Sequence, residues 1–159
     1  MAVLFLLSSI SITNPDKADN DEKALIKMAM WASEPIPFDP MEIALHKAYK
    51  DLHSEDERPT FKLIHEYPLG GKPPMMTHIF KNNLGEKIIA AKGAPEALMK
   101  ISNLSKEEIQ QIEKAIQTIT TEGYRVLGVG ESYFSNNNFP KTQQEFQFKF
   151  KGIVAFYDP

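Results

Sequence analysis

The chain has 159 residues, no cysteine and a formal net charge of −3. This length suits one compact domain with its own core, so we expect residues 1–159 to form a single domain. The absence of cysteine excludes disulfides, thiolate metal sites and a cysteine nucleophile. Because the basic residues form no run, the composition argues against a nucleic-acid partner and against contact with an anionic membrane.

Residues 1–12 form an apolar run with no preceding positive charge, which makes a poor secretory signal. The run is also too short to cross a bilayer, since a span needs about 20 apolar residues. We therefore predict a buried strand over residues 2–12, followed by a turn at Asn14-Pro15-Asp16.

Two helices are predicted next. Apolar residues at helical spacing predict the first over residues 20–32. The second spans residues 39–53, because Asp39 suits the N-cap and Pro40 the first helical position. Glu42 then falls where a capping box has its glutamate, which predicts that its side chain caps this helix.

Residues 60–69 alternate in polarity and predict a strand. One face of this strand is expected to carry Phe61, Leu63, His65, Tyr67 and Leu69. Residues 75–82 and 86–92 predict a hairpin, because a turn sequence rich in asparagine and glycine separates two apolar runs.

The remainder of the chain predicts a short helix after Gly93, a longer helix, and two strands. Ser105 and Glu108 form a capping box for the longer helix, which should end near Gly123. The strands cover residues 124–132 and 146–157. Helices and strands in this irregular order, with hairpins, favour an α+β fold with a mostly antiparallel β-sheet flanked by helices.

Lys92-Gly93-Ala94-Pro95-Glu96 follows an apolar strand and precedes the short helix. Ala90, two residues earlier on the same face, leaves space beside the long stem of Lys92. Spacing alone leaves two interpretations open. The lysine is either solvated before a glycine turn, or it lines a pocket for a flat ligand.

This pentapeptide resembles the signature of the nucleotide-binding domain of P-type cation-transporting ATPases. Four further segments resemble that family in the same order: residues 39–45, 66–77, 123–127 and 157–159. The last of these, Tyr157-Asp158-Pro159, resembles the start of the hinge to a phosphorylation domain. Within the second of these segments, Tyr67-Pro68-Leu69 resembles a bacterial branch of the calcium-type pumps.

The resemblance implies a domain that binds ATP, with Mg²⁺ carried by the nucleotide, and presents its γ-phosphate to an aspartate elsewhere. The aspartate-containing sequence Asp-Lys-Thr-Gly-Thr does not occur in this chain, so no catalytic residue is expected here. The implied partners are ATP or ADP and the phosphorylation and actuator domains of the same parent chain. The implied location is the cytoplasmic side of a bacterial plasma membrane.

The resemblance implies a role for each residue of this chain that matches a functional position of the family. Glu42 matches the acceptor for the adenine amino group, and Lys92 matches the lysine deep in the adenine pocket. Gly93 would let the purine approach the backbone. Arg125 matches the arginine that reaches the phosphates, and Leu127 matches the residue packed on base or ribose.

The sequence departs from the family pattern where an aromatic residue stacks on adenine. Leu69 occupies the aligned position, and Tyr67 reaches the same face if the strand shifts by two residues. The aligned position of a second phosphate-side lysine holds Pro74, although Lys72 is nearby. The stacking residue is therefore either Tyr67 or Leu69.

The sequence gives little indication of a metal site or a glycine-rich phosphate loop. The four histidines lack metal-ligand spacing, so we predict no metal site, and Met75-Met76 is assigned to the core. No Walker A or Gly-x-Gly-x-x-Gly sequence occurs. The alternatives are a non-enzymatic domain that binds a small ligand or a protein, and a free-standing phosphotransfer enzyme.

Overall fold

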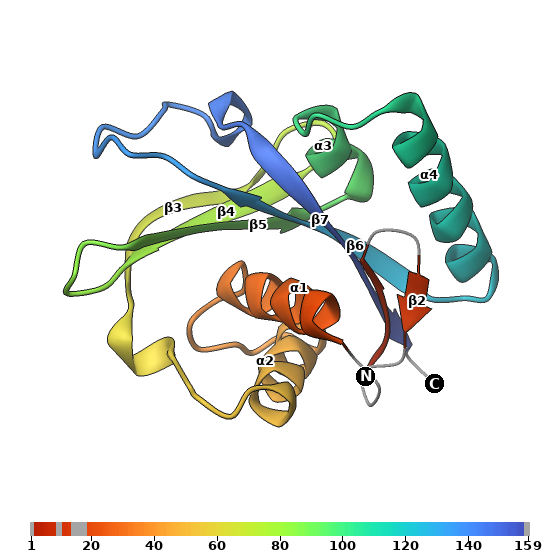
Figure 1. Cartoon of the computed structure of the whole chain (residues 1–159), viewed down its shortest axis with the longest axis horizontal. Helices are drawn as coiled ribbons and strands as arrows, with labels where there is room; N and C mark the ends of the chain where they lie inside the picture. Colours follow the sequence, from red (N-terminus) through yellow and green to blue (C-terminus); the bar gives the residue numbers. More distant parts are fainter. Residues whose placement is uncertain (1, 9–10, 14–18, 158–159) are drawn as a thin grey trace.

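The computed structural model describes residues 2–8, 11–13 and 19–157 (Figure 1). Within these residues, one seven-stranded sheet has the strand order β2-β1-β7-β6-β5-β4-β3. Helices α1 and α2 cover one face of the sheet, and α3 and α4 lie on the other (Figure 1). The predicted α+β fold with an antiparallel sheet flanked by helices is confirmed.

Every neighbouring pair of strands in the sheet is antiparallel. The strands are β1 (Ala2–Ser8), β2 (Ser11–Thr13), β3 (Lys62–Gly70), β4 (Met75–Lys81), β5 (Lys87–Gly93), β6 (Arg125–Ser132) and β7 (Phe148–Tyr157). The prediction of one strand over residues 2–12 is wrong, because residues 2–8 and 11–13 form two strands that pair antiparallel, with Ser8 opposite Ser11. The predicted turn at residues 14–16 lies outside the described residues.

The four predicted helices are confirmed. They are α1 (Asn20–Trp31), α2 (Pro40–Leu52), α3 (Pro95–Lys100) and α4 (Lys106–Thr121). Ser105 and Glu108 form both bonds of the predicted capping box at the start of α4. Short 3₁₀ turns occur at η2 (Arg58–Thr60) and η3 (Gln143–Glu145). None of the helices in the described ranges has the length and apolarity that a bilayer span requires.

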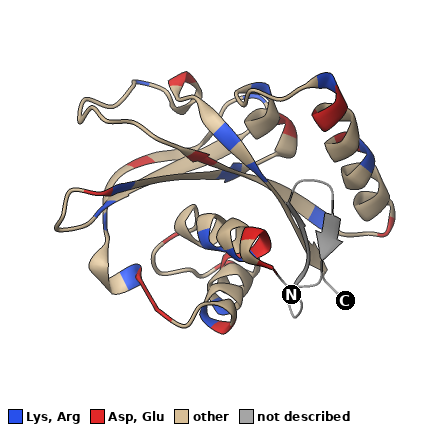
Figure 2. Cartoon of the chain, in the orientation of Figure 1, with Lys and Arg blue, Asp and Glu red and all other residues tan. Residues whose placement is uncertain are grey.

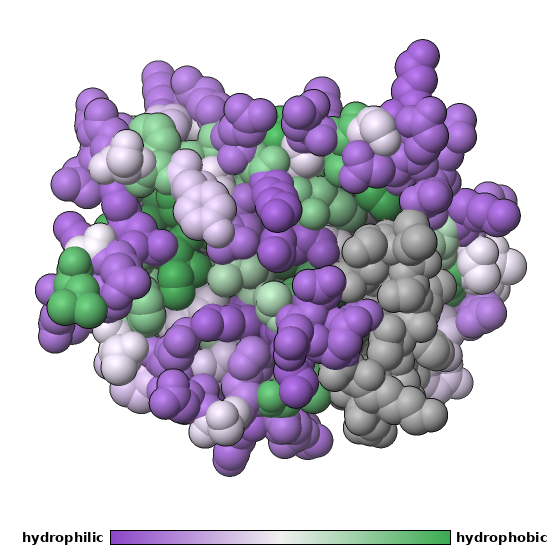
Figure 3. Space-filling model, in the orientation of Figure 1, coloured by the Kyte–Doolittle hydropathy of each residue, from purple (hydrophilic) through white to green (hydrophobic). Residues whose placement is uncertain are grey.

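The core has two layers, one on each face of the sheet. Trp31 of α1 and Leu45 of α2 pack against strand residues such as Phe80 on the first face. On the other face, Met75 packs with Leu98 of α3. Of the two methionines assigned to the core, Met75 is fully buried, whereas Met76 is half-buried. Charged residues of both signs are spread over the helices and strands (Figure 2), and hydrophilic side chains dominate the face shown in Figure 3.

The predicted alternation along β3 is wrong, because the strand contains two irregularities. The register shifts between Leu63 and His65, and again between Tyr67 and Gly70. Leu63 therefore packs towards α1 and α2, whereas Tyr67 packs into the core layer on the opposite face. A bulge inserts one extra residue, which sends the following side chains to the other side of the sheet.

Gly93 is required by packing at the end of β5. A Cβ at this position would lie 2.5 Å from the carbonyl oxygen of Pro74 and 2.6 Å from the Cα of Met75. We expect Gly93→Ala to lower the free energy of unfolding by about 1–3 kcal/mol, since backbone atoms block the added methyl. Urea denaturation measures this loss. Gly85→Ala is the control, because a Cβ at Gly85 would meet no atom within 4 Å. The loss of stability in this variant should come only from backbone strain at positive φ.

Candidate functional site

Glu42 and Lys92 form an ion pair beneath the surface. Lys92 Nζ lies 3.2 Å from Glu42 Oε2. Glu42 is only 4% exposed and Lys92 only 7%. Charged groups are rarely buried to this extent without a partner, and each here neutralises the other. The structure therefore brings together two of the predicted site residues, from α2 and β5.

The local sequence explains how Glu42 reaches this position. Asp39 accepts a hydrogen bond from the Glu42 backbone N–H at 3.0 Å, which starts α2 as predicted. The carboxylate of Glu42 does not return that bond as a capping box requires. It instead accepts a 2.6 Å hydrogen bond from the backbone N–H of Glu34 and faces Lys92. The carboxylate thus pairs with Lys92 and the loop before α2 rather than capping the helix.

Asp39 should contribute to stability in a pH-dependent way. Partial burial opposes its ionisation, but the hydrogen bond from the Glu42 backbone N–H and the charge of Lys92 outweigh burial and lower the pKa of Asp39. A lowered pKa in the folded state means that the contribution is present above the unfolded value and is lost as the pH falls through the folded value. We expect Asp39→Ala to cost about 1 kcal/mol at pH 7 and less at pH 3. Urea unfolding at the two pH values measures this difference, and an equal cost at both would contradict it.

Arg125 and Leu127 lie on β6, on the same face of the sheet as Lys92. Lys92 pairs with Val129, and alternation places residues 125, 127 and 129 on one side. Leu127 packs against the core beneath α1 and α2, whereas Val126 packs on the opposite side. Arg125 is exposed, and among the described residues it forms no ion pair. Val129, the residue of β6 that pairs with Lys92, is four residues from Arg125. This separation corresponds to about 13 Å along the strand.

Tyr67 and Leu69 occupy different environments. Tyr67 is buried in the core layer opposite Lys92, and its hydroxyl donates a hydrogen bond to the carbonyl of Pro140. Leu69 is 65% exposed. Phe38, which the sequence interpretation overlooked, is 82% exposed and directly precedes the cap residue Asp39. The sequence shows only that this aromatic residue directly precedes the helix cap, whereas its exposure is known from the structure.

A second cluster was also missed. Glu34, Glu66 and His78 place one ligand atom each within 4.8 Å of one another. Glu66 of β3 lies directly opposite His78 of β4, and Glu34 comes from the loop after α1. Burial and then the charge of Glu66 raise the pKa of Glu34. Only strand register reveals this cluster, because the three residues share no sequence spacing.

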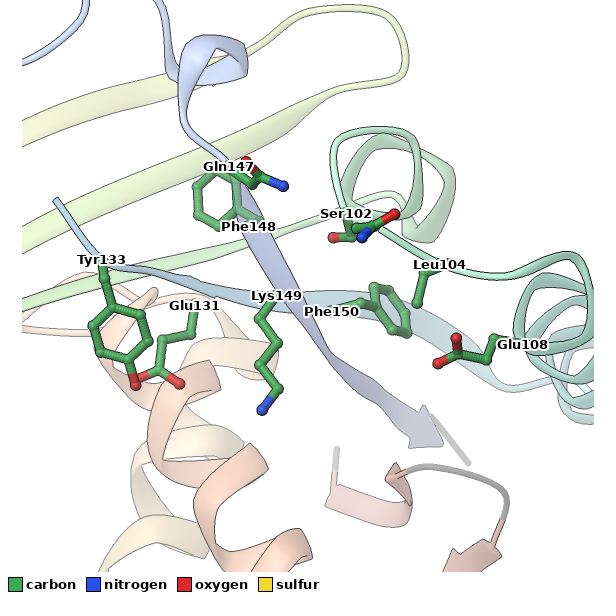
Figure 4. A pocket seen from close by; sticks show the side chains of 10 residues that line it. Ser102, Leu104, Glu108, Glu131, Tyr133, Gln147, Phe148, Lys149 and Phe150 are labelled. Atoms are coloured by element: carbon green, nitrogen blue, oxygen red, sulfur yellow. The ribbon is translucent and has the colours of Figure 1, made fainter.

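The cavity in Figure 4 is separate from the predicted site residues. It has a volume of about 390 Å³, and Ser102, Leu104, Lys149 and Phe150 are among the residues that line it. None of the residues predicted to bind nucleotide lines this cavity. It therefore provides a reference location for experiments that map ligand binding.

The family described as "P-type ATPase, cytoplasmic domain N" matches residues 33–159. This chain belongs to that family. The match includes Glu42, Lys92 and Arg125, so all three lie within the N domain. The predicted membership of a P-type ATPase N domain is confirmed.

Three ATPases are among the proteins that this chain resembles. The "Sodium/potassium exporting P-type ATPase cta3" of Schizosaccharomyces pombe is 28% identical over 133 residues, covering 76% of this chain and 13% of that protein. The "Probable plasma membrane ATPase" of Dictyostelium discoideum is 24% identical over 122 residues, covering 76% and 11%. The "Probable cation-transporting P-type ATPase" of Mycoplasma genitalium is 29% identical over 125 residues, covering 76% and 14%.

The chain thus spans between 11% and 14% of the length of these three relatives. Their names do not support the predicted calcium-type branch, because two are called sodium/potassium exporting or plasma membrane ATPases. They do not support a bacterial source either, since two of the three organisms are eukaryotic. The predicted hinge residues Asp158 and Pro159 lie outside the described residues.

Proposed function

We propose that this N domain binds ATP, with Mg²⁺ carried by the nucleotide, and that Glu42 and Lys92 recognise the adenine. The observation that carries the proposal is the buried ion pair between these two residues, inside the segment that matches the family. A carboxylate only accepts hydrogen bonds, so it suits the exocyclic amino group of adenine. Guanine carries a carbonyl at that position, and two acceptors would oppose each other.

The other proposed contacts with the nucleotide come from side chains of β6. Leu127 is partly buried and lies on β6 between Arg125 and Val129, the residue that pairs with Lys92. An apolar side chain at this position suits the base or the ribose. Arg125 is exposed beyond it, and a guanidinium offers planar paired donors to phosphate oxygens. We assign stacking on the adenine to an exposed residue, Leu69 or Phe38, because Tyr67 packs into the opposite core layer.

The contribution of this domain to the reaction is positioning. We propose that it holds the nucleotide so that the γ-phosphate protrudes towards an aspartate in a phosphorylation domain of the same parent chain. Fixing two reactants together raises their effective concentration. An actuator domain of the parent chain would complete the cycle of a membrane pump that moves a cation. Alone, the 159-residue chain should bind ATP or ADP without turnover.

Isothermal titration calorimetry of the 159-residue chain with ATP, ADP and GTP tests this function. We expect one site that binds ATP and ADP, binds GTP at least about tenfold more weakly, and shows no steady hydrolysis of ATP. Glu42→Gln should reduce the preference for ATP over GTP. Glu113→Gln, an exposed glutamate on α4, is the control and should leave the preference unchanged. Equal affinity for ATP and GTP, or a steady hydrolysis rate, would contradict the proposal.

A further inference from the structure

His78 has a fixed ring orientation on β4. Its side chain is fully buried, and its Nδ1 lies 3.0 Å from the backbone carbonyl of Ser33. A carbonyl oxygen only accepts, so Nδ1 must carry the hydrogen. In the neutral ring, Nε2 then presents a lone pair. This arrangement, with one ring nitrogen bonded to a backbone carbonyl, is the one that orients histidines that ligate metals.

The Nε2 atom of His78 faces two carboxylates. Nε2 has no hydrogen-bond partner within the described part of the chain. It lies 3.4 Å from Glu66 Oε1 and 3.8 Å from Glu34 Oε1. Three electron-rich atoms facing one another repel unless a proton or a metal ion lies between them. Two ligands that each lie about 2.1 Å from a tetrahedral Zn²⁺ are about 3.4 Å apart, so this spacing needs only a small adjustment.

We propose that Glu34, Glu66 and His78 bind a divalent transition metal ion of the Zn²⁺ class, with water completing the coordination. One imidazole and two carboxylates suit Zn²⁺, whereas Mg²⁺ and Ca²⁺ prefer oxygen ligands alone. The three donors come from the loop after α1, from β3 and from β4, so the folded sheet assembles them. The site is distinct from any Mg²⁺ carried by a nucleotide.

The metal site adjoins the nucleotide site without depending on it. The backbone N–H of Glu34 donates to Glu42, while the Glu34 side chain faces His78. Titration with metal in the absence of nucleotide therefore tests this inference alone. If metal binds and ATP does not, the metal site stands while the proposed nucleotide function fails.

The test is calorimetric titration of the chelator-treated, untagged 159-residue chain with ZnCl₂ and separately with MgCl₂, together with ¹⁵N spectra of the histidine rings. We expect one Zn²⁺ per chain, a shift of the His78 Nε2 resonance, and no such shift with Mg²⁺. Glu66→Gln should weaken Zn²⁺ binding at least about tenfold. Because Glu66 is exposed, this variant should fold even if His78→Gln does not.

Two controls separate this site from adventitious binding. His65→Gln removes an exposed histidine from the same strand as Glu66, and Glu113→Gln removes a carboxylate on the opposite face. Both should bind Zn²⁺ as the unmodified chain does. An absence of Zn²⁺ binding, an unchanged His78 resonance, or equal affinity in Glu66→Gln would overturn the inference.

Discussion

Lys92→Met should lower the free energy of unfolding by about 3–5 kcal/mol, because it leaves the buried carboxylate of Glu42 without its counter-charge. Methionine keeps most of the apolar stem, so the loss reports the charge rather than the packing. The backbone N–H of Glu34 remains bonded to the carboxylate and keeps the loss within this range. Urea denaturation at pH 7 measures the change.

A double-mutant cycle identifies the cause. Adding Glu42→Leu to Lys92→Met removes both charges, so the double variant should lose clearly less stability than the sum of the single variants. Lys62→Met, at an exposed position at the start of β3, is the matched control and should change stability by no more than about 0.5 kcal/mol. Additive losses in the cycle would show that the two residues do not stabilise each other.

Arg125→Ala should weaken ATP binding by about 10- to 150-fold while leaving adenosine binding unchanged. The range corresponds to the loss of hydrogen bonds between charged groups. Arg125 is exposed, so the fold should tolerate its removal. Calorimetry with ATP, AMP and adenosine measures the difference, which should grow with the number of phosphates.

The conservative variant refines this second test. Arg125→Lys keeps the charge but loses the planar pair of donors, so it should recover part of the ATP affinity. Lys149→Ala removes an exposed charge elsewhere on the sheet and should leave ATP affinity unchanged. A similar loss of ATP and adenosine binding in Arg125→Ala would place Arg125 at the base or in the fold rather than at the phosphates.

The features that the sequence predicted well are determined locally. Asp39 and Ser105 cap their helices because each bonds a backbone N–H three residues later. The hairpin of β4 and β5 followed from its turn. The ion pair of Glu42 with Lys92 joins elements that lie 50 residues apart, and only the family resemblance placed both at one site.

The features that the sequence missed depend on pairing between strands. The bulges in β3 send Tyr67 to the opposite face from Leu63, and no pattern within residues 60–69 reveals them. The cluster around His78 likewise requires the register between β3 and β4, together with the loop that carries Glu34. The antiparallel pairing of β1 with β2 divides an apolar run that suggested one continuous strand.

The most direct test of the proposed nucleotide site is a ¹⁵N–¹H nuclear magnetic resonance titration of the 159-residue chain with ATP. We predict shifts concentrated at residues 42, 92–93 and 125–127, and much smaller shifts in Lys92→Met at equal nucleotide concentration. Shifts concentrated instead around the cavity lined by Ser102 and Phe150, or an absence of saturable shifts, would contradict the account.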